Sequence, residues 1–125
     1  MSVTYVKPAT VLVVEDESLI RMDIVDCLEE AGFLIAEASN ADEAINILQS
    51  RADIRLVFTD IHMPGSMDGL KLAAFVRKRW PPIKIIVTSG HTEVAEDEVP
   101  FGARFFRKPY NRPEVAQAVR EMIAG

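Results

Sequence analysis

The chain has 125 residues, of which 49% are hydrophobic and 26% are charged, and its formal net charge is −5. These values predict one soluble globular domain and exclude a disordered, collagen-like or disulfide-stapled chain. The acidic balance argues against a nucleic-acid surface, and the lack of a long apolar run or apolar leader predicts a cytoplasmic protein. Cys27 is the one cysteine and falls in a helical pattern, so we expect a small core residue there.

The period of the hydrophobic pattern switches repeatedly along the chain between that of a strand and that of a helix. In chain order it predicts a strand over 10–14, a helix over 20–31, a strand over 33–38, a helix over 40–51, a strand over 54–59, a helix over 68–80, strands over 83–89 and 103–107, and a helix over 115–123. The run TVLVV is β-branched throughout, which is typical of a strand buried on both faces. Asn40 and Glu43 have the spacing of a capping box.

Strands that alternate with helices indicate right-handed crossovers and a parallel sheet covered on both faces. In such a fold, ligands bind beyond the carboxyl ends of the strands, near the point where the strand order reverses. Side chains that directly follow the predicted strands are therefore the candidates for a functional site.

Polar residues follow four of the predicted strands: Glu15, Asp16 and Glu17, then Asp60, Ser89 and Lys108. Each alone has an ordinary explanation, since a carboxylate after a strand often caps the next helix, as we expect for Glu17. Three carboxylates brought together repel one another, however, and a hard divalent cation is the usual remedy. Oxygen ligands without a histidine or cysteine cage favour Mg²⁺ or Mn²⁺ over zinc.

Phosphoryl transfer is the chemistry that uses such a set of residues. A carboxylate can attack phosphorus to form an acyl phosphate, while a metal ion and a lysine neutralise charge on the phosphoryl oxygens. We predict Asp60 as the phosphoacceptor because it ends the central strand and precedes a loop rich in turn formers. Glu15 and Asp16 would hold the metal with it. Lys108 would pair with the phosphoryl group, and Ser89 would hydrogen-bond it.

The motifs VLVVEDE, LVFTDIHMPG, IIVTSG and FFRKPY occur in this order over essentially the whole chain. Together they resemble the receiver domain of bacterial two-component response regulators, with residues 1–9 as an N-terminal tail and residues 10–125 as the domain. The resemblance implies an α/β fold with a doubly wound, five-stranded parallel sheet of order 2-1-3-4-5, which is the flavodoxin-like, CheY-like fold. It also implies Mg²⁺-dependent phosphotransfer to Asp60 from a histidine kinase or histidine phosphotransfer protein. The backbone carbonyl of His62 would complete the metal site.

Four positions depart from the pattern of this family. Glu15 stands where an aspartate is commoner, and Ser89 stands where a threonine is commoner. Phe105 occupies the position of the family's switch aromatic but lacks a hydroxyl, so we expect it to toggle by packing alone. Ser66 makes the loop after Asp60 one residue longer than usual.

The segment 90–102, between the last two predicted strands, is acidic and offers few apolar side chains to bury. We expect a shortened or irregular fourth helix there, or a shortened loop without regulatory meaning. His62 and His91 have no companion cysteine or histidine at ligand spacing, so neither a phosphohistidine relay nor a histidine metal site is favoured. We conjecture that His91 tunes the lifetime of the phosphoryl group.

The sequence therefore predicts a phosphorylation-gated switch that acts on a downstream protein partner, and not an enzyme, a DNA-binding protein or a membrane protein. Self-catalysed phosphotransfer and autodephosphorylation would be its only reactions. Two alternatives stay open. A pseudo-receiver that binds partners without phosphorylation usually lacks one of the acidic or lysine positions, which are all filled here. A small Mg²⁺-dependent aspartate-nucleophile phosphatase would need a second acid two residues after Asp60, where this chain has His62.

Overall fold

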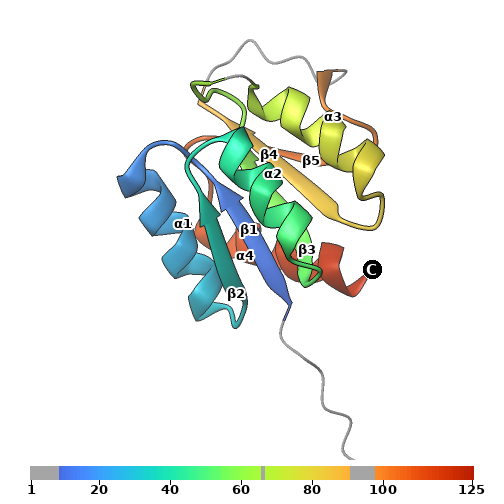
Figure 1. The fold of residues 1–125 in the computed structure, drawn as a ribbon. Helices are drawn as coiled ribbons and strands as arrows, with labels where there is room; N and C mark the ends of the chain where they lie inside the picture. The colour runs from blue at the N-terminus through green and yellow to red at the C-terminus, as the bar shows by residue number, and fades with distance from the viewer. Residues whose placement is uncertain (1–8, 66, 91–97) are drawn as a thin grey trace, which may run out of the picture.

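The computed structural model describes residues 9–65, 67–90 and 98–125. Its helices and strands, in chain order, are β1 (Thr10–Val14), α1 (Ser18–Glu30), β2 (Leu34–Ala38), α2 (Ala41–Ser50), β3 (Ile54–Asp60), α3 (Gly69–Arg79), β4 (Lys84–Ser89), β5 (Arg104–Arg107) and α4 (Arg112–Ala124). Figure 1 shows the strands side by side with helices packed around them. Among the residues described, no helix combines the length and the apolar character needed to cross a membrane.

The strands form one five-stranded sheet of order β2-β1-β3-β4-β5, and every neighbouring pair is parallel. The predicted fold class and strand order are therefore confirmed. β1 lies inside the sheet, between β2 and β3, and all five of its residues are buried, as its unbroken β-branched run predicts. The strand order reverses at β1 and β3, which places the carboxyl ends of these two strands at the expected position for a site.

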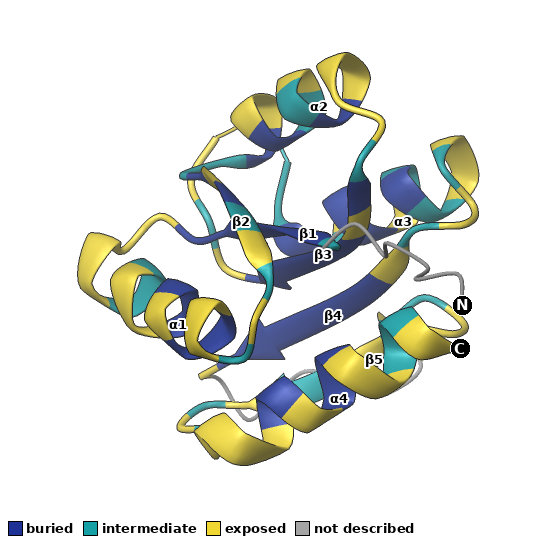
Figure 2. Ribbon diagram, turned by 90° about the horizontal axis from the view of Figure 1, so that it is seen from below, coloured by how far each residue is buried: buried dark blue, intermediate teal, exposed yellow. Residues whose placement is uncertain are grey.

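The described helices cover both faces of the sheet (Figure 2). On one face, α1 and α4 contribute apolar side chains such as Leu28 and Val119, which pack with Val11 and Val13 of β1. On the other face, α2 and α3 pack against the alternate residues of the same strand. Cys27 is buried in the α1–α4 layer, so its prediction as a core residue is confirmed.

Asparagine or aspartate side chains cap three of the four described α-helices. The side chains of Asn40, Asp68 and Asn111 each accept a hydrogen bond from a backbone N–H in the first turn of α2, α3 or α4. The expectation for Glu17 was wrong: it occupies the N-cap position of α1, but its side chain makes no capping hydrogen bond. The capping box at α2 is also rearranged, because Glu43 accepts from the N–H of Ser39 and not from that of Asn40.

The element boundaries differ from the predictions by a few residues. β3 extends through Asp60, and α4 begins at Arg112, three residues before the predicted start, because Asn111 caps the helix and Pro113 lies in its first turn. In the connection between β4 and β5, the residues that the structure describes contain no α-helix. Ser66, His91 and most of the predicted tail lie outside the described residues.

Candidate functional site

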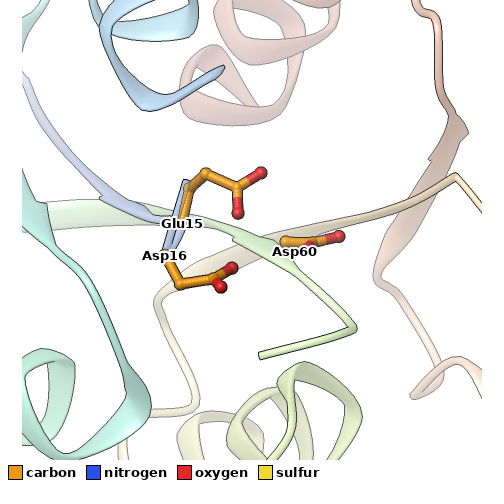
Figure 3. Close-up of side chains that lie close together, drawn as sticks. All are labelled: Glu15, Asp16 and Asp60. Carbon is orange, nitrogen blue, oxygen red and sulfur yellow. The ribbon is translucent and has the colours of Figure 1, made fainter. Parts of the chain in front are cut away.

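Three carboxylates gather at the carboxyl ends of β1 and β3 (Figure 3). Glu15 and Asp16 directly follow β1, and Asp60 is the last residue of β3. Each residue offers one carboxylate oxygen, and these oxygens all lie within 4.8 Å of one another. Glu15 is 3% exposed and Asp60 is 7% exposed, whereas Asp16 is exposed. The parallel sheet thus brings together the three acids that the sequence singled out.

Lys108, from the end of β5, completes this cluster from the other side. Its Nζ lies 2.8 Å from Oε1 of Glu15 and 3.4 Å from Oδ1 of Asp60. The shorter of the two ion pairs is therefore with Glu15, the residue whose side chain is one methylene longer than the aspartate common in the family. Lys108 bridges two acids that would otherwise repel each other in a largely buried place.

The environment shifts the pKa values of both partners in this ion pair. Burial raises the pKa of Glu15, and the nearby charge of Asp60 adds to the increase, which the hydrogen bond from Lys108 reduces without cancelling. Burial by itself would lower the pKa of Lys108, but its bonds and charge interactions with Glu15 and Asp60 outweigh that effect and raise it. Negative charge is thus concentrated in a place that disfavours it, which is the condition that an added cation relieves.

The donor set fits a hard divalent cation. Every candidate side-chain ligand is a carboxylate oxygen, and neither histidine nor cysteine belongs to the cluster that the described residues form. Such ligands suit Mg²⁺ or Mn²⁺. His62 is exposed in the loop directly after Asp60, and the part predicted for its backbone carbonyl stays a prediction.

Ser89 lies on β4, the strand beside β3, and Phe105 lies on β5, the edge strand beside β4. Ser89 ends β4 and is buried, and its backbone carbonyl accepts a hydrogen bond of 2.8 Å from the N–H of Lys108. Phe105 pairs in register with Val87 of β4 and packs, half-buried, against the core on the α2–α3 face. Backbone hydrogen bonds thus couple the strand that carries Phe105 to the end of the sheet where the acids lie.

Sequence reasoning missed two residues that hold this edge of the sheet in place. The N–H of Gly69 donates a hydrogen bond of 2.8 Å to the carbonyl of Ile61, and a Cβ at Gly69 would lie 1.9 Å from the carbonyl oxygen of Asp60. Arg21, in the first turn of α1, donates a hydrogen bond of 2.7 Å to the backbone carbonyl of Glu15. Both contacts involve backbone atoms, which no motif in the sequence reveals.

Comparisons with known proteins agree with this geometry. The family model of the response regulator receiver domain matches residues 11–120. The chain is 38% identical over 119 residues to the sensor kinase CckA of Brucella abortus, an alignment that covers 92% of this chain and 12% of the kinase. It is 30% identical to the response regulator receiver protein CpdR of the same organism, over 90% of this chain and 95% of CpdR. The chain thus spans a small part of some relatives and nearly all of another.

Solved structures show the same architecture. A response regulator receiver protein from Sinorhizobium medicae superposes with a TM-score of 0.88 at 28% identity, covering 95% of this chain and 97% of that one. The response regulator TrrA from Thermotoga maritima, solved in complex with Mg²⁺ and BeF, superposes with a TM-score of 0.83 at 32% identity. That alignment covers 91% of this chain and 98% of TrrA.

Proposed function

Because the chain belongs to the response regulator receiver family, we propose that Asp60 accepts a phosphoryl group from a phosphohistidine of a histidine kinase or phosphotransfer protein. The observation that carries this proposal is the meeting of Asp60 with Lys108 and two further carboxylates at one edge of the sheet. In the transfer, a carboxylate oxygen of Asp60 bonds to phosphorus while the bond from phosphorus to the donor's imidazole nitrogen breaks. The imidazole keeps the electron pair and takes up a proton.

The neighbouring residues supply binding and charge compensation. Lys108, which pairs with Glu15 and Asp60 in this structure, would turn part of that interaction to the phosphoryl oxygens. Glu15, Asp16 and Asp60, with the backbone carbonyl of His62, would hold a Mg²⁺ or Mn²⁺ ion, which supplies further neutralisation of the phosphoryl charge. The complex of the relative TrrA with Mg²⁺ and BeF supports this assignment.

The phosphoryl group would act as a switch by adding a dianion next to the buried end of β4. Ser89 would donate its hydroxyl to a phosphoryl oxygen, and Lys108 would move toward the same group. The backbone bond between these two residues would transmit the change to β5, where Phe105 would repack. A downstream protein would then bind the altered surface. The receiver chain itself would have no enzymatic activity toward another substrate and would act in the cytoplasm.

The rim of the site offers a surface for a protein donor. A cavity of about 460 Å³ opens beside Lys108 and is lined by Leu19 and Ile20 of α1 and by Tyr110. The ring of Tyr110 packs edge-on against that of Phe58, with 5.9 Å between the ring centroids, so contact with the core stabilises this wall of the cavity. A small phosphodonor needs no such apolar wall, whereas a phosphorylated protein would bury it on docking.

Intact-mass analysis after incubation with acetyl phosphate and Mg²⁺ tests the proposed chemistry. We expect the mass of one phosphoryl group to be added to the wild-type chain and to Asp68→Asn, but not to Asp60→Asn. Asp68→Asn is the matched control, because it changes an aspartate in the same loop and asparagine also caps helices.

The same samples separate the two alternatives. If no adduct forms although Mg²⁺ binds, and beryllofluoride, which mimics the phosphoryl group, does not bind either, rapid hydrolysis is excluded and the chain acts as a binding module without phosphorylation. Rapid turnover of a generic phosphatase substrate that depends on Asp60 would instead indicate a phosphatase.

A further inference from the structure

Arg21 joins three parts of the molecule behind the acidic cluster. Its Nη1 donates a hydrogen bond of 2.7 Å to the backbone carbonyl of Glu15, and its Nε donates one of 3.1 Å to Oε1 of Glu37 on β2. The side chain of Arg21 is only 21% exposed, so the guanidinium is held at the surface of the protein and not free in solvent. A planar guanidinium can make both bonds at once with fixed geometry, which an ammonium cannot.

The carbonyl that Arg21 binds belongs to the peptide that links Glu15 to Asp16. The N–H of Glu15 donates to the carbonyl of Ala38 at 3.0 Å, so the backbone of Glu15 is bound on both sides. Asp16 follows in a bend outside β1 and α1, and it is exposed. The Asp16 side chain is not held by burial, so its direction depends on the orientation of the preceding peptide and on its contact with the Glu15 side chain.

We propose that Arg21 is a positioning residue, which fixes the peptide between Glu15 and Asp16 and so directs both carboxylates toward the cation site. This inference rests on the proposed function, because it concerns the same Mg²⁺ site. Glu37 has a second part in the arrangement: its ion pair keeps the guanidinium turned toward β2 and away from the carboxylates that would bind the cation.

Positioning and simple charge effects predict changes of opposite sign when Arg21 is neutralised. By Coulomb's law alone, removing a positive charge near three carboxylates would strengthen cation binding. If Arg21 orients the ligands, its removal weakens cation binding instead, although the site becomes more negative. Residues that orient metal ligands typically change metal affinity by about 10- to 100-fold when they are replaced.

Isothermal titration of the wild-type chain and its variants with MgCl₂ tests the proposal. Arg21→Met keeps the apolar stem and removes both hydrogen bonds, and we expect it to raise the Kd for Mg²⁺ by about 10-fold. Arg21→Lys can still reach one acceptor, so we expect part of the affinity to return. The control is Arg120→Ala, because Arg120 lies beside the opposite end of α1 and its loss removes the same charge. Its Kd should stay within about 2-fold of the wild-type value.

The outcomes separate the inference from the proposed function. If the wild-type chain binds no Mg²⁺, the proposed function fails and the role of Arg21 falls with it. If the wild-type chain binds Mg²⁺ and Arg21→Met binds it equally well or more tightly, the positioning role is overturned while the proposed function stands. Thermal unfolding without metal identifies a folding defect in Arg21→Met. In that case Arg21→Lys and Glu37→Gln take its place, and Kd values at or below that of the wild-type chain in both would overturn the proposal.

Discussion

Gly69 lies so close to the backbone of Asp60 that there is no room for a side chain at this position. A Cβ at this position would lie 1.9 Å from the carbonyl oxygen of Asp60, and that neighbour is backbone, which cannot swing away. We predict that Gly69→Ala lowers the free energy of unfolding by about 1–3 kcal/mol, because the loop and the end of β3 must move apart. Urea denaturation measures this change.

Gly90→Ala is the matched control for Gly69→Ala. A Cβ at Gly90 would meet no atom closer than 3.9 Å, and the residue also borders the site, beside Lys108. We expect its free energy of unfolding to change by less than about 1 kcal/mol in either direction. Equal effects of the two substitutions would show that the contact with Asp60 is unimportant.

Asp53 stabilises the fold by an amount that decreases as the pH falls into the acid range. The hydrogen bond from Arg51, with a second from Thr10, lowers the pKa of Asp53 from 3.8 to about 2. Since the folded pKa lies below the unfolded value, the ionised carboxylate stabilises the fold. This contribution is complete above the unfolded pKa and is lost as the pH falls through the folded pKa near 2.

The prediction for Asp53 is tested by the difference in unfolding free energy between the wild-type chain and Asp53→Asn. We expect the wild-type chain to be the more stable of the two near pH 6 and the difference to shrink as the pH is lowered to about 3. Urea denaturation at several pH values measures it. A difference that stays constant over this range would contradict the assigned cause.

At the scale of secondary structure, the helix starts provide a direct comparison of caps. Asn111 accepts a hydrogen bond of 3.0 Å from the N–H of Glu114 at the start of α4, whereas the side chain of Glu17 makes no capping bond at α1. We predict that Asn111→Ala lowers the free energy of unfolding by about 1 kcal/mol and that Glu17→Ala lowers it by less than about 0.5 kcal/mol. Urea denaturation of the two variants measures both. An equal loss would mean that Glu17 stabilises α1 in another way.

The elements also show why sequence predicted so much of this molecule. The apolar runs and helical spacings were strong enough to predict each described strand and helix, and the parallel order then brought Asp60 and Lys108 to one edge. The sequence did not predict which of several neighbouring backbone groups a side chain would hydrogen-bond. Glu43 bonds to Ser39 and Arg21 bonds to the carbonyl of Glu15, and every residue type carries the same backbone acceptor.

For the molecule as a whole, the cluster of Glu15, Asp16 and Asp60 lowers stability, and the rest of the fold compensates for this loss. Three carboxylates held within 4.8 Å of one another oppose folding, and Lys108 offsets only part of their repulsion. The buried apolar side chains of the strands and helices keep this edge assembled. The proposed site for a cation and a phosphoryl group is therefore preformed at the expense of stability.

This trade-off predicts how Asp16→Asn responds to Mg²⁺. Without metal, the variant should unfold at the same temperature as the wild-type chain or a higher one, because an exposed charge has been removed from a repulsive cluster. With Mg²⁺ at 10 times its Kd, the wild-type chain should gain about 1.4 kcal/mol by mass action, and the variant should gain much less. Asp26→Asn, which removes an exposed charge on α1, should keep the full response to Mg²⁺. Thermal unfolding with and without MgCl₂ measures both effects. If Asp16→Asn is less stable than the wild-type chain without metal and gains as much stability from Mg²⁺, Asp16 stabilises the fold and does not bind the cation.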